Sequence, residues 1–300
     1  MTTTTPGIKR LSFSELQTYY DCPFKRYLVY DKKMREQDNP YKLFGRAIDD
    51  AIGDFLVLHK PPIEVFTKVS NLLSWDDADD LTKTQLQQLA SKTSKSKTGK
   101  ALLEEWREIA LIQLTGLFEC YDSASNSLGL PGIKERVTIL ATQVWLNTQA
   151  QNSAFVGAVD LVGRGNSTGK SYIFDIKTAG RPWLWRDPKT RIKEKQLLLY
   201  KAHISETVQN EDKYRFLADQ LQLDYDNVET YYLFLYRSKT AEMEVKKIAS
   251  TTPLVTEAAK SLDGAARKIL SGFKAKTSDQ NTCKLCHLKD KCHAGELDDL

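Results

Sequence analysis

The sequence predicts an α/β protein in which helices precede a sheet. Apolar residues recur at helical spacing over much of the first 130 positions, whereas later positions form β-rich runs separated by turn residues. The 300 residues are 41% hydrophobic and 27% charged, which is typical of a globular chain that buries a core without disulfides. We therefore expect one large domain or two small ones.

The N-terminal third is expected to be helical. Ser12 and Glu15 have the spacing of a capping box, so a helix is expected over residues 12–30 after a flexible leader. Apolar spacing predicts a second helix over residues 43–58, and polar helices follow it. Turn-forming residues at 126–133 end this part of the chain.

The second half of the chain supplies the sheet. Three β-rich runs are expected to form a meander, followed by a helix, a further strand and a last helix, at residues 137–146, 154–164, 171–178, 194–207, 228–239 and 253–270. The expected divisions are a leader, an N-terminal helical segment, a helical subdomain, the α/β core and a C-terminal tail, at residues 1–11, 12–59, 60–133, 134–250 and 251–300.

Composition excludes several classes of protein. No run of 18 apolar residues is present, so a membrane span is excluded, and the first residues lack the apolar stretch of a secretory signal. We therefore expect a cytoplasmic protein whose five cysteines are reduced thiols. The formal net charge of +4 permits nucleic acid as a partner without arguing for it.

Three cysteines form one C-terminal motif. Cys283, Cys286 and Cys292 have the spacing C-x2-C-x5-C, so their thiolates can converge on one metal centre that needs a fourth ligand. Zinc would accept a histidine there, such as His287 or His293, whereas an iron–sulfur cluster prefers a fourth thiolate. Coincidental spacing is the remaining interpretation.

The fourth thiolate is expected from the other end of the chain. Cys22 lies in an aromatic helical segment, whereas Cys120 lies on an apolar helix face and is expected to be a buried free thiol. A metal site that includes Cys22 would tie the N-terminal helix to the C-terminal tail.

Charged residues interrupt two of the expected strands. Asp160 lies in an apolar strand, and the next strand carries Asp175 and Lys177, which share one face because they are two residues apart. A hairpin through residues 165–170 would bring the carboxylates together as ligands for Mg2+, beside a lysine that orients or deprotonates water. A surface ion pair between Asp175 and Lys177 is the alternative.

A polar edge is expected on the helix that follows these strands. Gln196 and Tyr200 are four residues apart within a leucine-rich segment, so they lie on the same side of the helix. Both can hydrogen-bond a phosphate or a catalytic side chain. The alternative is that they form the edge of an ordinary amphipathic helix.

The order of these motifs resembles the PD-(D/E)xK nuclease superfamily, in particular its RecB/AddB-like iron–sulfur branch, which includes the CRISPR-associated four-cysteine nucleases. That pattern is a first cysteine, G-x3-H, D, D/E-x-K, Q-x3-Y and C-x2-C-x5-C. The chain matches it over residues 12–295 at Cys22, Gly45, Asp160, Asp175, Lys177, Gln196, Tyr200, Cys283, Cys286 and Cys292. Asp49 stands where the family has its histidine.

The resemblance implies a restriction-endonuclease-like fold, with a central mixed sheet between helices, and metal-dependent hydrolysis of DNA. An exonuclease of DNA repair or recombination is the expected enzyme. Lys177 would position the attacking water, while Gln196 and Tyr200 would orient Lys177 or the substrate. The implied ligands of Mg2+ or Mn2+ are Asp49, Asp160, Asp175 and the carbonyl of Ile176, and a carboxylate at position 49 suits a hard cation.

The resemblance also implies a structural 4Fe-4S cluster on Cys22, Cys283, Cys286 and Cys292. The implied partners are single-stranded DNA or DNA ends, and proteins of recombination, replication or CRISPR adaptation. Two alternatives stay open: a catalytically idle DNA-binding protein on the same fold, which Asp49 favours, and a zinc-binding interaction module whose D-x-K motif is incidental.

Overall fold

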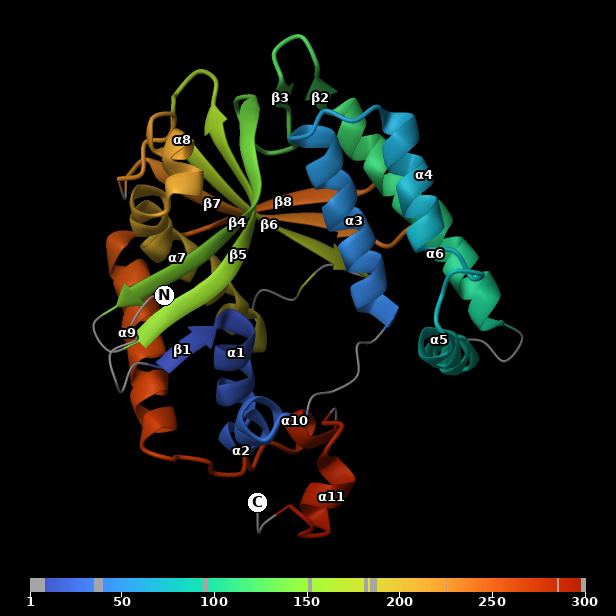
Figure 1. Cartoon of the computed structure of the whole chain (residues 1–300), viewed down its shortest axis with the longest axis vertical. Coiled ribbons are helices and arrows are strands. Elements are labelled where there is room, and N and C mark those ends of the chain that lie inside the picture. The colour runs from blue at the N-terminus through green and yellow to red at the C-terminus, as the bar shows by residue number, and fades with distance from the viewer. Residues whose placement is uncertain are drawn as a thin grey trace.

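The computed structural model describes residues 9–34, 40–93, 97–150, 153–180, 183, 188–224, 226–284 and 286–297. These residues form a mixed α/β fold in which helices flank a curled central sheet (Figure 1). The strand order is β2-β3-β4-β5-β6-β7-β8, and β1 pairs with β5 outside this path. The expected mixed sheet between helices is therefore confirmed.

The strands are β1 (Lys9–Ser12), β2 (Tyr121–Asp122), β3 (Ser127–Leu128), β4 (Val137–Ala150), β5 (Ser153–Gly165), β6 (Ser171–Ala179), β7 (Val228–Tyr236) and β8 (Met243–Ile248). The main helices are α1 (Phe13–Asp21), α2 (Pro23–Arg26), α3 (Pro40–Leu56), α4 (Pro62–Leu72), α5 (Asp80–Thr93), α6 (Gly99–Glu119), α7 (Pro188–Asn210), α8 (Arg215–Ala218), α9 (Thr252–Leu270), α10 (Gln280–Lys284) and α11 (Lys289–His293). Among the described residues, no helix has the length and hydrophobicity needed to cross a bilayer.

The predicted meander is present as β4, β5 and β6. These three strands pair antiparallel, whereas β7 runs parallel to β6 because α7 carries the chain back between them. Strand β8, which the sequence did not predict, pairs with β7 at the end of the sheet. Its sequence MEVKKI carries three charges, and such charges are common on edge strands.

The N-terminal leader is shorter than residues 1–11. Lys9–Ser12 forms β1, which pairs in parallel with β5 so that Leu11 lies opposite Phe155. Leu11 is fully buried by this pairing. The prediction of a flexible leader was therefore wrong for residues 9–11. A short strand needs few apolar residues of its own when it pairs with a longer strand. Residues 1–8 lie outside the described residues.

The helix predicted over residues 12–30 is interrupted at Cys22. Ser12 caps α1 as its spacing predicts, because its Oγ accepts a hydrogen bond from the Glu15 amide at 3.1 Å. Cys22 has an extended backbone, and Pro23 then begins α2. Proline disfavours helical conformation in the residue before it, which explains why the helix is divided there.

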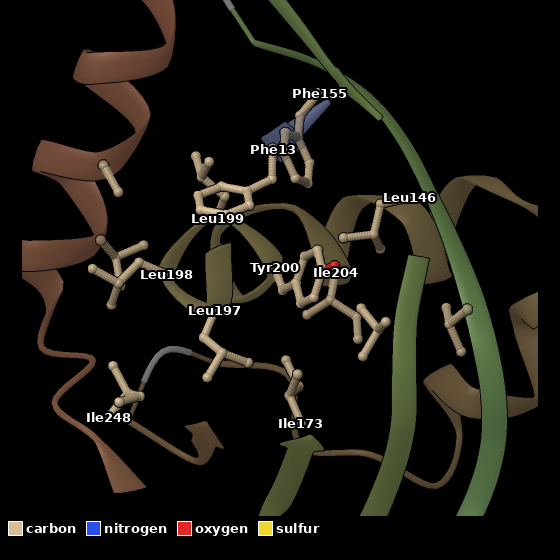
Figure 2. Packing of buried hydrophobic residues seen from close by; sticks show 14 of the residues in the cluster. Phe13, Leu146, Phe155, Ile173, Leu197, Leu198, Leu199, Tyr200, Ile204 and Ile248 are labelled. Atoms are coloured by element: carbon tan, nitrogen blue, oxygen red, sulfur yellow. The ribbon is translucent and has the colours of Figure 1, made fainter. Parts of the chain in front are cut away.

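Each face of the sheet carries a hydrophobic core. Helices α1, α7 and α9 cover one face, whereas α3 and α6 lie against the other and α4 and α5 pack on α3 and α6 (Figure 1). Figure 2 shows three consecutive buried leucines of α7, Leu197, Leu198 and Leu199, packed within the first core. Because this packing fixes the rotation of α7, it also fixes the direction of the polar side chains that α7 carries.

Candidate active site and cysteine cavity

The candidate active site lies where β5 and β6 separate. These strands pair only from Leu161 opposite Phe174 to Arg164 opposite Ser171. Asp160 and Asp175 occupy the first positions beyond that pairing. The amide of Ile176 donates to the side chain of Asp160 on β5, at 2.7 Å from Oδ2, and not to a backbone carbonyl of that strand. Where the two strands no longer pair, a backbone amide therefore holds the Asp160 side chain by a hydrogen bond, and Asp160 and Asp175 lie opposite each other.

Asp175 lies at the centre of a network between β6 and α7. Its side chain is 1% exposed and forms an ion pair with Lys177 on the same strand. Gln196 donates to Oδ1 of Asp175 at 2.7 Å and lies 2.7 Å from the Tyr200 hydroxyl. The helix α7 therefore presents its polar edge to the strand that carries the D-x-K motif, as the spacing of Gln196 and Tyr200 predicted.

Asp49 approaches the same carboxylates from the opposite face of the sheet. It lies on α3, and its pKa is raised well above the ordinary value by burial first and then by the charge of Asp160. Asp175 contributes further repulsion, while Lys177 opposes it. Asp49, Asp160, Asp175 and Lys177 therefore influence one another's charge. Gln196 joins this group through its hydrogen bonds to Asp175 and Tyr200.

The crowding of these acids perturbs their titration. Burial raises the pKa of Asp160 to about 7, and the charge of Asp175 adds to this effect. The pKa of Asp175 is also raised, mainly by burial, although Lys177 opposes the shift. Removing buried carboxylates from water penalises their charged form, so a divalent cation at this site would relieve an existing repulsion.

For Lys177, the charges of neighbouring groups outweigh burial in setting the pKa. Burial alone would lower the pKa of its ammonium group, but the charges of Asp175 and Asp160 outweigh burial and raise it. The side chain therefore stays protonated near neutral pH. This favours positioning and charge stabilisation by Lys177 over the abstraction of a proton from water.

Gln143 is a site residue that the sequence did not reveal. It lies on β4 opposite Asp160, and its side chain donates to Oδ1 of Asp160 at 3.2 Å. Its backbone has φ of +51°, a left-handed conformation that is uncommon for a residue with a side chain. Strained backbone of this kind concentrates at functional sites, so the strain is consistent with a role in holding Asp160.

The carboxylate group is suited to a hard cation by its chemistry. Each oxygen of Asp160 accepts one hydrogen bond and has capacity for a further ligand. Within the part of the chain that the structure describes, however, no three His, Cys, Asp or Glu side chains are arranged closely enough to hold a metal ion. The roles of Asp49, Asp160, Asp175 and Ile176 as metal ligands therefore remain predictions.

Four cysteines line one cavity. This cavity, of about 420 Å3, lies between the α1–α2 junction and the C-terminal tail, and it is lined by Cys22, Cys283, Cys286 and Cys292. Phe24, Leu28 and Leu288 form an apolar cluster around it. In Figure 1, α2, α10 and α11 gather at one end of the molecule. The structure thus brings together the two ends of the chain that the cysteine pattern related.

Cys120 lies elsewhere, in the core on the opposite face of the sheet. Its thiol is within 3.3 Å of the Gly116 carbonyl, and burial raises its pKa. No disulfide links any of the five cysteines, all of which the structure describes. Four thiols are a ligand set that an iron–sulfur cluster or zinc would accept, but as the structure describes them they are not arranged closely enough to hold one ion, so the metal centre stays a prediction.

Comparison with protein families defines the class of this chain. The family model described as the PD-(D/E)XK nuclease superfamily matches residues 10–293. This match spans almost the whole sequence, so the chain belongs to the PD-(D/E)XK nuclease superfamily. The superfamily that the motifs indicated is therefore confirmed, whereas its iron–sulfur branch stays a prediction.

Two solved structures resemble most of the chain at low sequence identity. A crystal structure of a candidate exonuclease from Eubacterium rectale is 12% identical, with a TM-score of 0.49, over 94% of this chain and 87% of that chain. The crystal structure of SSO0001 is also 12% identical, with a TM-score of 0.36, over 98% and 89% of the two chains. No curated protein matches the sequence. The family assignment therefore depends on the family model.

Proposed function

We propose that this chain is a metal-dependent deoxyribonuclease, an exonuclease that processes DNA ends in repair or recombination. The observation that carries the proposal is the grouping of Asp160, Asp175 and Lys177 where β5 and β6 separate. Their membership in a PD-(D/E)XK chain supports a catalytic role over a surface ion pair, and so does the burial of Asp175. The exonuclease and repair roles come from the resemblance of the motif order.

Asp160 and Asp175, with Asp49 and the Ile176 carbonyl, would hold Mg2+ or Mn2+. The bound cation would polarise the phosphoryl group and lower the pKa of water. Hydrolysis then adds a water oxygen to phosphorus and breaks the bond to one ester oxygen, which leaves with a proton. Lys177, kept protonated by Asp175, would stabilise the charge that develops on the phosphate.

Gln196 and Tyr200 would act by holding Asp175. The Gln196 amide donates to the carboxylate, and the pKa of Tyr200 is raised well above its ordinary value by burial and then by Asp175, so the hydroxyl keeps its proton. Both groups therefore remain neutral hydrogen-bonding partners at neutral pH. They position the carboxylate without adding charge to the site.

The proposal is tested with linear and circular single-stranded DNA, incubated with the purified chain and Mg2+, Mn2+ or EDTA. We expect the linear strand alone to be degraded, and only with a divalent cation. Cleavage of the circular strand would show an endonuclease instead. Binding of either DNA without any cleavage would support the idle DNA-binding alternative.

We further propose that Cys22, Cys283, Cys286 and Cys292 hold a 4Fe-4S cluster that fastens the chain ends together. The support is their convergence on one cavity, together with the motif spacing. The cluster would be structural, since its thiolates join α2 to α10 and α11 and the metal-bound state would stabilise that closure.

Anaerobic purification followed by absorption spectroscopy and metal analysis tests this assignment. A brown protein that absorbs at about 400 nm and contains iron is expected, because iron–sulfur thiolate centres are coloured. A colourless protein that contains zinc would replace the cluster with a zinc site, as in the interaction-module alternative.

A further inference from the structure

Tyr232 is a buried residue of β7 that lies beside the strand with the D-x-K motif. Strand β7 runs parallel to β6, and in their register Tyr232 is the partner of Asp175. Partners in neighbouring strands point to the same face of a sheet, and Lys177 shares that face because it lies two residues from Asp175. The Tyr232 side chain is fully buried. Its ring therefore lies among the charged groups of the candidate active site.

The Tyr232 ring provides a surface for the Lys177 ammonium group. Nζ of Lys177 lies over this ring, 5.8 Å from its centre, and also forms an ion pair with Asp175. A cation is attracted to the face of an aromatic ring at distances up to about 6 Å, and the attraction is stronger where water is excluded. The lysine is thus held from two sides, by a carboxylate of its own strand and by a ring of the next strand.

Two further contacts fix the orientation of the Tyr232 ring. Its hydroxyl donates to the Lys193 carbonyl of α7 at 2.5 Å. The Trp183 ring packs against it in an edge-to-face arrangement, with the ring centres 5.3 Å apart and the planes at 61°. Such pairs are favourable because the positive edge of one ring meets the negative face of the other. These contacts hold the Tyr232 ring independently of Lys177.

A second contact matters for Lys177 because a lysine is flexible. Its ammonium group is a compact charge on a four-carbon stem, without the rigid fork of an arginine. The ion pair with Asp175 alone therefore leaves the ammonium group several positions around the carboxylate. A misplacement of about 1 Å at a catalytic group can lower a rate by about 100-fold. A ring fixed on the neighbouring strand restricts the ammonium group to one side of Asp175.

We infer that Tyr232 is a positioning residue whose ring face holds the Lys177 ammonium group where charge develops on the phosphate. The inference rests on the proposed nuclease function and adds a residue outside the D-x-K and Q-x3-Y motifs. Because its side chain is fully buried, Tyr232 acts through Lys177 and not by contact with DNA.

Cleavage of linear single-stranded DNA at saturating Mg2+ separates the ring from the hydroxyl. Tyr232→Leu removes the ring and should lower kcat by about 10-fold, which lies within the range of one cation–π contact shielded from water. KM should change little, since Lys177 stabilises charge that develops only in the transition state. Tyr232→Phe keeps the ring and should restore most of the parent kcat.

Tyr231→Leu is the matched control. Tyr231 precedes Tyr232 on β7, is also buried, and has the ammonium group of Lys247 over its ring at 5.8 Å from the centre. It belongs, however, to the core on the other face of the sheet. Its replacement therefore removes an equivalent ring and an equivalent lysine contact without touching Lys177, and kcat should keep the parent value.

An NMR measurement reports the position of Lys177 without any cleavage. In protein isotopically labelled at the ε-carbon of lysine, the Lys177 signal is assigned from its loss in Lys177→Arg. An aromatic ring shifts the signals of nearby nuclei, so Tyr232→Leu should move this signal, whereas Tyr232→Phe and Tyr231→Leu should leave it in place. If the parent cleaves no DNA while the signal behaves in this way, the proposed function fails and the positioning of Lys177 stands.

If Tyr232→Leu does not fold by circular dichroism, fluorination of the ring in Tyr232→Phe takes its place. Added fluorines nearly preserve the shape of the ring while they withdraw negative charge from its face, so kcat should fall with each fluorine. A constant kcat along this series would overturn the inference, as would an unmoved Lys177 signal in Tyr232→Leu or an equal loss of kcat in Tyr231→Leu. Equal losses in Tyr232→Phe and Tyr232→Leu would also overturn it, because the hydroxyl and not the ring would then be responsible.

Discussion

Replacing Asp160 with asparagine should make the metal-free protein more stable while it removes the candidate activity. The pKa of Asp160 is raised from 3.8 to about 7, chiefly by burial and the charge of Asp175. The folded chain therefore binds this proton more tightly than the unfolded chain does. Stability consequently falls as the pH rises from about 4 to about 7, and the full cost is present above that range.

The magnitude of this cost follows from the size of the shift. About three pKa units correspond to roughly 4 kcal/mol, at 1.36 kcal/mol per unit. Solvent reaches part of the site and screens these charges, so we expect Asp160→Asn to gain about 1–3 kcal/mol at pH 8. Asparagine can still accept the bond from the Ile176 amide, which limits the structural disturbance.

Urea denaturation of the metal-free protein at pH 5 and pH 8 measures the effect. The gain should be full at pH 8 and about a third as large at pH 5, where the unfolded chain is already ionised while the folded chain still holds the proton of Asp160. Asp224→Asn is the control, because its pKa is lowered by hydrogen bonds from Asn227, and its replacement should not stabilise the fold. Equal stability of Asp160→Asn and the parent at pH 8 would refute the reasoning.

Three further predictions concern other parts of the chain. Gln143→Ala should weaken Mg2+ activation of cleavage by about 10-fold or more, since the amide orients Asp160, and an unchanged activation curve would remove Gln143 from the site. At subsaturating Mg2+, the cleavage rate should rise with pH up to about 7, where Asp160 loses its proton, and a flat profile would contradict this assignment. Cys22→Ser should lose iron and thermal stability, whereas Cys120→Ser should keep the iron, and the reverse pattern would show that the fourth ligand was chosen wrongly.

The candidate catalytic acids could be picked out in the sequence because charges are costly in apolar strands. Asp160 and Asp175 each interrupt a buried run, and such residues need a partner or a metal. Gln143 gave no comparable signal. Its place opposite Asp160 depends on the register of β4 and β5, which shifts between Ile139 and Ala141, and a shift of this kind is not visible in hydrophobic patterning.

The basic residues Lys42, Arg46 and Arg237, which line one surface pocket with Asp49, were missed for a related reason. Lys42 and Arg46 look like ordinary solvated positions of an amphipathic helix, and Arg237 follows a strand among other polar residues. Their relation to one another appears only when α3 packs across the ends of β6 and β7. Local spacing predicts which face of a helix is polar, but it does not predict which distant charge that face will meet.

For the cysteine cavity, the sequence predicted which cysteines lie together but not the backbone geometry that brings them there. The C-terminal spacing indicated a common site, and the choice of Cys22 over Cys120 followed from the surroundings of the two cysteines and from the resemblance, whose pattern begins with a cysteine. The structure places Cys22 at a break in the helix where Pro23 turns the chain, so its thiol reaches the cavity from the end of α1. That break was not predicted.

The most direct measurement of the central claim is the rate of single-stranded DNA degradation, with Mg2+, by purified Asp175→Ala and Lys177→Ala beside the parent. Both variants should bind the DNA nearly as the parent does, since phosphate contacts of other lysines and arginines dominate affinity. Each should lose cleavage by about 100-fold or more, because charge stabilisation of this kind is worth that much in rate. Cleavage at the parent rate by either folded variant would contradict the assignment of the active site to the separation of β5 and β6.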